Sequence, residues 1–135
     1  MAATPVVFQV ETTLAACRGD PTLACELVEQ YRASLLEEQA VLAQARAATP
    51  PDWEAIGRRV HRLQSGGGFL GVERIAVAAQ RLEAEILAQA GATVLDAAWR
   101  GLDGALDEFL AVPVEEWERR LRVVHRPAVG AVPDR

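Results

Sequence analysis

The stretch WEAIGRRVHRLQSGGGFLGVERIAVAAQRLEAEI, residues 53–86, decides the fold. Its apolar residues recur in steps of three and four, the stripe that a helix presents to a bundle core. Gly71 divides the stripe and predicts a break, so two helices joined by a tight turn are expected. The first helix contributes Trp53, Ile56, Val60, Leu63, Gly67 and Leu70, and the second contributes Val72, Ile75, Ala79, Leu82 and Ile86.

On the N-terminal side, Asp20 followed by Pro21 predicts a helix start, because aspartate caps helices and proline suits the first position. This helix is expected to run from about 21 to 48, where TPPD at 49–52 ends it. A short helix ending at Gly19 is expected before it. The apolar face of the long helix is predicted to comprise Leu23, Leu27, Tyr31, Leu35 and Leu42.

On the C-terminal side, AGAT at 90–93 predicts a turn, and Pro113 ends the helix that follows. The stripe of this helix comprises Leu95, Ala98, Leu102, Ala105, Leu106 and Phe109. The fold class is therefore all-α: an antiparallel four-helix bundle with a short extra N-terminal helix and a possible C-terminal helical extension. The bundle is assigned to residues 1–112, with its core at about 8–110. Residues 113–135 are expected to form an extension that is partly helical and then loose.

Size and composition narrow the class of function. The chain has 135 residues, which is one domain, and its net charge of −5 argues against nucleic acid as a partner. The first residues are not expected to act as a signal peptide, and no apolar run reaches the length that a membrane span needs. Cys17 and Cys25 are too few for a disulfide framework and suit a reducing compartment. We expect a cytoplasmic protein that is free-standing or a terminal domain.

The three consecutive glycines Gly66, Gly67 and Gly68 need an explanation, since glycine is poorer than alanine in a helix by about 1 kcal/mol. At about 100° per residue, His61 lies about 130° from the middle of the apolar stripe, so it should face solvent. Small residues surround it along the helix, which would let another protein approach the imidazole. Gly57, Gly66 and Gly68 are predicted to provide this clearance, whereas Gly67 falls on the stripe and should permit close helix packing.

The segment HRLQSGGGFLGVERIAVAAQRLE, residues 61–83, resembles the signature of histidine-containing phosphotransfer (HPt) domains of multistep two-component phosphorelays. In this resemblance His61 stands at the phosphorylated position, Gly71 at the helix-breaking glycine and Leu82–Glu83 at the closing pair. The helical pattern of about residues 8–110 also fits the family. Many members carry lysine three residues after the histidine, where this chain has Gln64, and Ala79 replaces a frequent cysteine.

The resemblance implies a phosphoprotein that relays a phosphoryl group between receiver-domain aspartates through N-phosphorylated His61. Such a carrier is not an enzyme and has no autokinase activity. Its expected partners are response-regulator receiver domains and a hybrid sensor histidine kinase. The chain itself would need no cofactor, because Mg²⁺ belongs to the receiver.

Supporting roles around His61 follow from the same implication. Gln64, Arg58 and Ser65 are expected to contact or support the phosphoryl group. Arg59 and Arg62 are expected to supply positive charge for docking an acidic receiver. The apolar part of the docking surface is assigned to Phe69, Leu70 and Leu14, and His125 is given no role.

Three alternatives remain open. A bundle that binds a kinase or receiver without accepting phosphate is favoured by Gln64, since a neutral amide cannot replace the charge of lysine. A helical enzyme or metal bundle is disfavoured, because the sequence has no Glu-x-x-His pairs and no zinc-ligand spacing. A dimerising bundle is the third, with Trp53, Trp99 and Trp117 in either core or interface.

Overall fold

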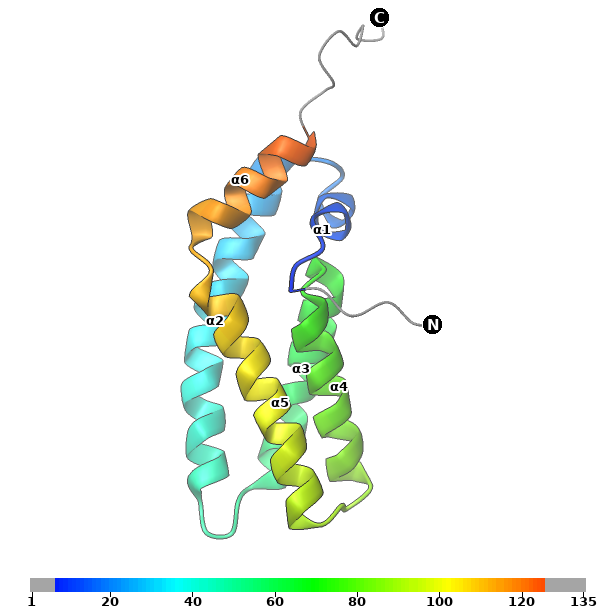
Figure 1. The fold of residues 1–135 in the computed structure, drawn as a ribbon, viewed down its shortest axis with the longest axis vertical. Coiled ribbons are helices and arrows are strands. Elements are labelled where there is room, and N and C mark those ends of the chain that lie inside the picture. The colour runs from blue at the N-terminus through cyan, green and yellow to red at the C-terminus, as the bar shows by residue number, and fades with distance from the viewer. Residues whose placement is uncertain (1–6, 126–135) are drawn as a thin grey trace, which may run out of the picture.

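The computed structural model describes residues 7–125 and the side chains of residues 7–123. Within that range the chain is helical and has no strand (Figure 1), which confirms the predicted fold class. The helices are α1 (Val10–Ala16), α2 (Pro21–Ala47), α3 (Trp53–Leu70), α4 (Glu73–Leu87), α5 (Ala92–Ala111) and α6 (Val114–His125).

Helices α2 to α5 run alternately down and up and form the antiparallel bundle (Figure 1). Each connection is short, so helices that follow one another in sequence lie side by side. The predicted stripes are buried: Ile56, Val60 and Leu63 of α3 face the same core as Ile75 and Leu82 of α4. The interior therefore follows the spacing of three and four read from residues 53–86.

Polar caps fix the predicted helix starts. The Asp20 carboxylate accepts hydrogen bonds from the backbone N–H groups of Thr22 and Leu23, and Pro21 occupies the first turn. The Asp52 carboxylate accepts from the N–H of Ala55 in the same way at the start of α3. These bonds satisfy donors that have no partner within a helix, which is why α2 and α3 begin where predicted.

Gly71 ends α3 in the left-handed conformation, with φ of 79°, as its predicted role as a helix breaker requires. A Cβ atom at this position would lie 2.6 Å from the carbonyl oxygen of Gln9, so only glycine fits. The N–H of Gln9 donates to the Gly71 carbonyl at 2.6 Å, and the Thr13 hydroxyl donates to the Leu70 carbonyl. The α3–α4 turn is thereby held against α1.

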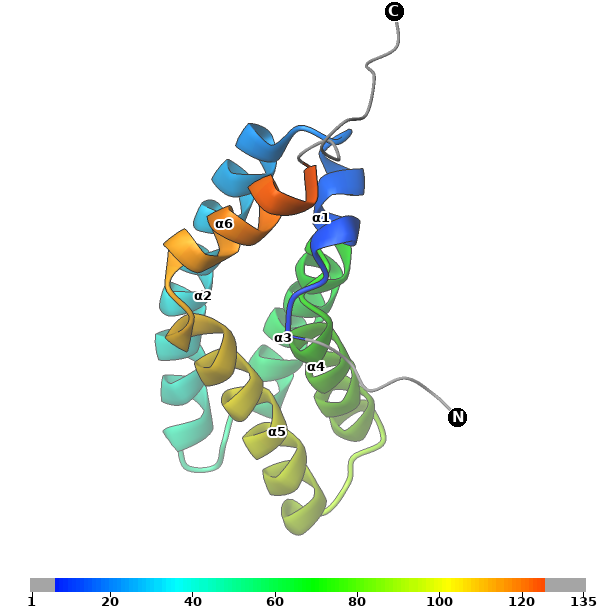
Figure 2. The same cartoon turned by 45° about the horizontal axis from the view of Figure 1, so that its top comes forward.

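The buried face of α2 differs from the prediction in its first two turns. Leu23 is exposed, while Ala24, Cys25 and Val28 are buried. The reason is that α6 and α1 cover the beginning of α2 (Figure 2), whereas α3 and α5 cover the rest. A single stripe cannot describe a helix whose neighbours change along its length.

Helix α6 packs onto the bundle and extends its core. Trp117 and Leu121 are fully buried in the same cluster as Phe8 and Phe109. The division at residue 112 therefore separates side chains that share one core, and the helical part of the extension is α6, 12 residues long. The predicted loose segment beyond it lies outside the described residues. Of the other tryptophans, Trp53 and Trp99 are partly buried against the core.

Candidate functional site

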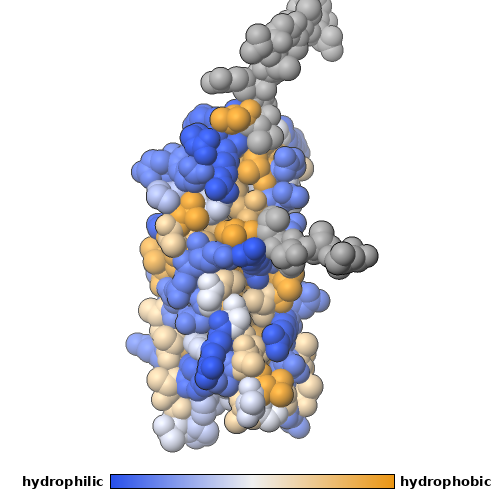
Figure 3. Space-filling view, viewed as in Figure 1, coloured by the Kyte–Doolittle hydropathy of each residue, from blue (hydrophilic) through white to orange (hydrophobic). Residues whose placement is uncertain are grey.

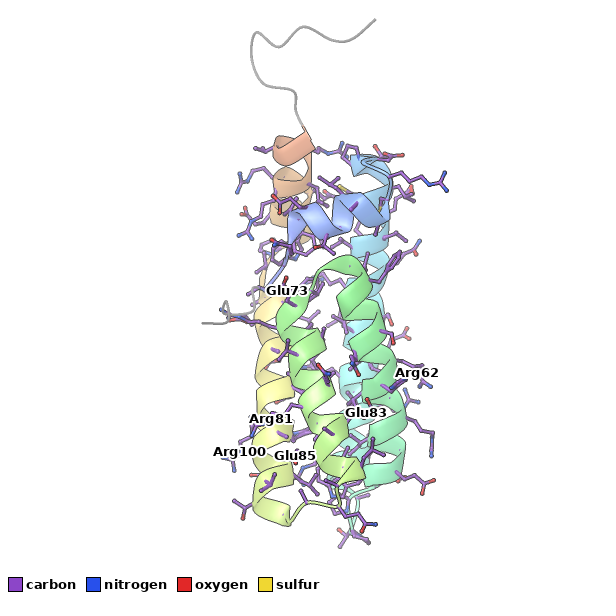
Figure 4. All side chains as sticks on the ribbon, turned by 90° about the vertical axis from the view of Figure 1, so that its right-hand side faces the viewer. Arg62, Glu73, Arg81, Glu83, Glu85 and Arg100 are labelled. Atoms are coloured by element: carbon purple, nitrogen blue, oxygen red, sulfur yellow. The ribbon has the colours of Figure 1, made fainter. Side chains whose placement is uncertain are left out.

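The α3–α4 hairpin brings His61 opposite Glu83. The two residues lie at nearly equal separations in sequence from the Gly71–Val72 turn, so an antiparallel hairpin places them side by side. Nδ1 of His61 lies 2.8 Å from Oε2 of Glu83. The histidine side chain is 64% exposed, as predicted from its angular position on the helix. Figure 4 shows Glu83 between the two helices and Arg62 on the outward side of α3.

The contact with Glu83 assigns the two ring nitrogens of His61. An ionised carboxylate only accepts hydrogen bonds, so Nδ1 carries the proton and donates it to Glu83. In the neutral ring Nε2 then holds the free lone pair, and the fixed hydrogen bond orients the ring. The arrangement presents a nucleophilic nitrogen on an exposed helix face.

The glycines around His61 have different surroundings. A Cβ atom at Gly68 would meet nothing within 4 Å, in agreement with its predicted clearance role. A Cβ at Gly66 would lie 3.1 Å from the ring of Tyr31, so this glycine packs against α2, and its clearance role stays a prediction. A Cβ at Gly57 would make ordinary contact with Ile86 at 3.6 Å. Gly67 permits close helix packing as predicted, since its Cβ would lie 3.2 Å from the Val72 carbonyl oxygen.

The three arginines point in different directions. Arg58 pairs with Glu54 at 3.0 Å on the exposed surface, one turn from His61. Arg59 pairs with Glu38 of α2 at 2.8 Å, so its charge is balanced on the side away from His61, and its docking role stays a prediction. Arg62 lies exposed next to His61 and has no ion pair within the part of the chain that the structure describes. Arg58 and Arg62 therefore remain as the positive charges near the imidazole.

The other predicted neighbours are only partly placed near His61. Ser65 is exposed, and its hydroxyl donates to the His61 carbonyl at 3.4 Å. Gln64 is half-buried on α3. Phe69 is exposed and available to a partner, but Leu14 and Leu70 are buried in the core and do not form the predicted docking surface.

A groove of about 520 Å³ runs beside His61 between α3 and α4. Gly57 forms part of its floor, and Ile86 and Leu87 of α4 form an apolar wall. Arg58 and Arg62 stand at its α3 edge. A molecule that reaches His61 through this groove would therefore meet apolar side chains together with arginine and glutamate side chains.

Glu83 is the residue that sequence reasoning left without a role, although it belongs to the quoted closing pair. The available signal was the hairpin itself. Once Gly71 is accepted as the turn, residues at equal separations from it must face each other, as Gly57 and Ile86 also do. Applying that rule to His61 leads to the Leu82–Glu83 pair; Leu82 is buried in the core, which leaves Glu83 as the polar neighbour of the ring.

Within the described range, no group of three or more His, Cys, Asp or Glu side chains is arranged to hold a metal ion. Both cysteines, Cys17 and Cys25, are buried free thiols whose pKa is raised by burial. No described helix combines the length and hydropathy needed to cross a bilayer.

Comparison with known families gives one match. The family model described as Hpt domain matches residues 26–125, which covers His61, Glu83 and helices α3 to α6. Neither the curated proteins nor the solved structures gave a significant match.

Proposed function

The chain belongs to the Hpt domain family, and from this premise we propose that it relays a phosphoryl group between receiver-domain aspartates through His61. Hpt domains are phosphocarrier modules of two-component signalling and interact with kinases and receiver domains. The observation that carries the proposal is the exposed His61 ring, whose Nδ1 is held 2.8 Å from Glu83.

In the proposed step, the lone pair of His61 Nε2 attacks the phosphorus of an aspartyl phosphate on the receiver. The N–P bond forms as the bond to the aspartate oxygen breaks, and the aspartate leaves as a carboxylate. The Nδ1 proton stays on the ring, and the positive charge that develops there is stabilised by Glu83. No proton has to leave, so the reverse attack by a second receiver's aspartate expels a neutral imidazole.

The chain's own contribution is positioning and charge, which is what phosphoryl transfer requires most. Glu83 holds the ring, Gly68 leaves the helix face open, and Arg58 and Arg62 supply positive charge near the transferred group. We assign Mg²⁺ to the receiver and no cofactor to this chain. A receiver or a hybrid histidine kinase in the cytoplasm would supply the phosphoryl group, and the chain has no autokinase role.

Transfer from isolated receiver domains charged with acetyl phosphate tests the proposal. The wild-type chain should acquire an acid-labile, base-stable label, and His61→Gln should acquire none. The chain has two histidines, so His125→Gln is the matched control and should be labelled like the wild type. Labelling of His61→Gln, or no labelling of the wild type by any receiver tested, would contradict the proposal.

A second candidate function rests on Gln64. In place of the frequent lysine it offers a neutral hydrogen bond, which stabilises a phosphoryl group less than an ammonium does. The candidate is a bundle that binds a kinase or receiver without accepting phosphate. Saturable receiver binding without any label on His61 would support this reading, and restoration of labelling by Gln64→Lys would identify the cause.

A further inference from the structure

A second groove, of about 380 Å³, runs between α4 and α5. It is separate from the groove beside His61, because Arg81 lines it while Glu83, two residues further along α4, points to the other side of that helix. Alanine and glycine residues line most of it, and Val77 of α4, which is 49% exposed, adds a larger apolar side chain. Figure 3 looks onto α5 and shows weakly hydrophobic and near-neutral residues there among hydrophilic ones.

Two glycines in the middle of α5, Gly101 and Gly104, are not required by the packing of the chain. Neither has a positive φ, and glycine is less favourable than alanine in a regular helix. A Cβ atom at either position would meet nothing within 4 Å, so no neighbouring element of the described chain covers them. Ala97 and Ala111 continue the same exposed face in steps of four and seven residues. Such a face allows the backbone of another helix to approach closely.

Charges of opposite sign lie along one edge of this face. Arg100 and Asp107 are seven residues apart, so they project from the same side of α5, about 10 Å from each other along the helix axis. Arg100 is 77% exposed and shares Asp96 with Arg46, so its ion pair constrains it weakly. Asp107 accepts a hydrogen bond from the Gln39 amide at 2.8 Å and has no ion pair among the described residues. The edge therefore carries excess positive charge at one end and an unpaired negative charge at the other.

A twofold axis makes this face complementary to itself. Where two copies of α5 cross antiparallel at Gly101 and Gly104, Arg100 lies within about 3 Å of the level of the partner's Asp107 along the helix. A twofold axis perpendicular to both helices keeps their equivalent edges on the same side, so the opposite charges face each other twice. A parallel arrangement would instead place like charges at the same level.

We propose that the outer face of α5 and the α4–α5 groove form a homodimer interface, with the second copy packed antiparallel across Gly101 and Gly104. A second copy is favoured over an unrelated partner because the face itself supplies both charges of each ion pair. The interface does not depend on the proposed phosphotransfer. Because α5 packs against α2 and α4 and lies diagonally across the bundle from α3, His61 of both copies stays accessible (Figure 2).

Sedimentation velocity of the full-length chain at increasing concentration tests the interface. The contact is narrow and falls at the small end of specific interfaces, so we expect a dissociation constant on the order of 10 μM. The mass should rise from 14.6 kDa to twice that value as the concentration passes through this range.

Substitutions on α5 test the arrangement of the two copies. Gly104→Leu places a bulky side chain at the crossing and should raise the dissociation constant at least about 10-fold. Asp107→Arg faces the partner's Arg100 and should raise it about as much. Combining Arg100→Asp with Asp107→Arg restores opposite charges across the axis and should return the dissociation constant to within about threefold of the wild type.

Matched controls carry the same changes elsewhere on the chain. Gly68→Leu also fills open space on an exposed helix face, and Glu37→Arg reverses an exposed charge on the side of α2 turned away from Gln39. Both should leave the dissociation constant unchanged, and circular dichroism checks the helicity of every variant. Gly104→Leu should still be labelled by a charged receiver like the wild type, since it lies on the far side of the bundle from His61.

Each contrary outcome has a distinct meaning. A mass that stays at 14.6 kDa up to about 500 μM would overturn the interface. A dimer that neither Gly104→Leu nor Asp107→Arg weakens would place the contact elsewhere and reject the proposal as well. If the double variant dimerises no better than Asp107→Arg alone, the antiparallel arrangement is wrong. If no receiver labels the wild type, the proposed function fails, while the mass measurement still decides the interface.

Discussion

The contact between His61 and Glu83 gives the two ring nitrogens of His61 different roles. The carboxylate engages Nδ1 at 2.8 Å and leaves Nε2 for chemistry. Because the histidine side chain is 64% exposed, the ring needs this bond to hold one orientation in solvent. In the proposed transfer, the same carboxylate would balance the charge that the ring gains as Nε2 bonds to phosphorus.

Replacing Glu83 by glutamine should slow phosphotransfer to His61 about 5- to 20-fold, because the amide loses the negative charge that stabilises the developing imidazolium. The amide can also donate to Nδ1 and so favour the wrong tautomer. The measurement is the transfer rate from a charged receiver, together with ¹⁵N NMR of the ring nitrogens. Glu85→Gln, which removes a nearby α4 charge, is the control. Wild-type rates and tautomer ratios in Glu83→Gln would refute the assigned role.

Gly66 and Gly68 should respond oppositely to alanine. Gly68→Ala has free space around its Cβ and should stabilise the fold by about 0.5–1 kcal/mol through helix propensity. At Gly66 the new Cβ would lie 3.1 Å from Tyr31, whose ring is held edge-on against Phe109. That contact should cancel the gain or reverse it. Urea unfolding of both variants measures the difference, and equal stabilisation would contradict the packing account.

These residues also show what the sequence predicts at this scale. The exposure of His61 and the packing role of Gly67 follow from helical phase alone. The role of Gly66 does not, because it depends on where α2 crosses α3. The pairing of Arg59 with Glu38 depends on the same crossing. Phase within a helix is a local property, whereas the identity of the facing helix is not.

At the scale of the element, helix ends follow local chemistry. Asp20, Asp52 and Gly71 act where their residue types predict, since caps and left-handed turns need only neighbouring backbone. The buried face of α2 was harder to predict because α6, α1, α3 and α5 cover different parts of it. Long helices with several neighbours lose the single stripe on which prediction relies.

Helix α6 contains two glutamates whose pKa values move in opposite directions. A hydrogen bond with Glu29 of α2 raises the pKa of Glu118, with burial and the charge of Glu29 adding to the effect. Hydrogen bonds from Arg119 and Arg120 lower the pKa of Glu116. The stabilising contribution of Glu118 to the free energy of unfolding is thus present when Glu118 is protonated, and it is lost as pH rises through its raised pKa. The stabilising contribution of Glu116 is present when Glu116 is ionised, and it is lost as pH falls through its lowered pKa.

Amide variants of these residues should therefore diverge at neutral pH. At about pH 7, Glu118→Gln should raise the free energy of unfolding and Glu116→Gln should lower it. Below about pH 3 both differences should shrink toward zero as the carboxyls become protonated. Urea unfolding across this range is the measurement. The same sign for both variants at neutral pH would contradict the assigned contacts.

The whole molecule has its core extended by α1 and α6 at the end where α2 begins. Phe8 lies edge-on to Trp117 at 4.6 Å between ring centroids, and Trp117 stacks on Phe109 at 5.4 Å. Residues from both ends of the described chain thus meet one residue of α5. The sequence predicts the four-helix bundle because its stripes are regular. It does not predict the docking of α6. In the sequence, the spacing of Trp117 and Leu121 would also fit an amphipathic helix that does not pack onto the bundle.

Trp117 should therefore carry much of the stability of the fold. It is 1% exposed, so Trp117→Ala should lower the free energy of unfolding by about 3–5 kcal/mol through lost contact and the cavity left behind. Trp99→Ala removes an equally large side chain that is only partly buried, and should cost less. Urea unfolding followed by circular dichroism measures both without depending on tryptophan fluorescence.

Trp117→Phe separates volume from polarity at the same position. The indole Nε1–H of Trp117 is buried and finds no acceptor among the residues that the structure describes. Phenylalanine keeps the ring stacked on Phe109 and removes this unsatisfied donor, whose burial costs about 1–3 kcal/mol. Trp117→Phe should thus lower the free energy of unfolding by less than about half as much as Trp117→Ala does. The removal of the unsatisfied donor offsets part of the stability lost with the smaller side-chain volume. If Trp117→Ala costs no more than Trp99→Ala, α6 is an appendage and the bundle ends with α5.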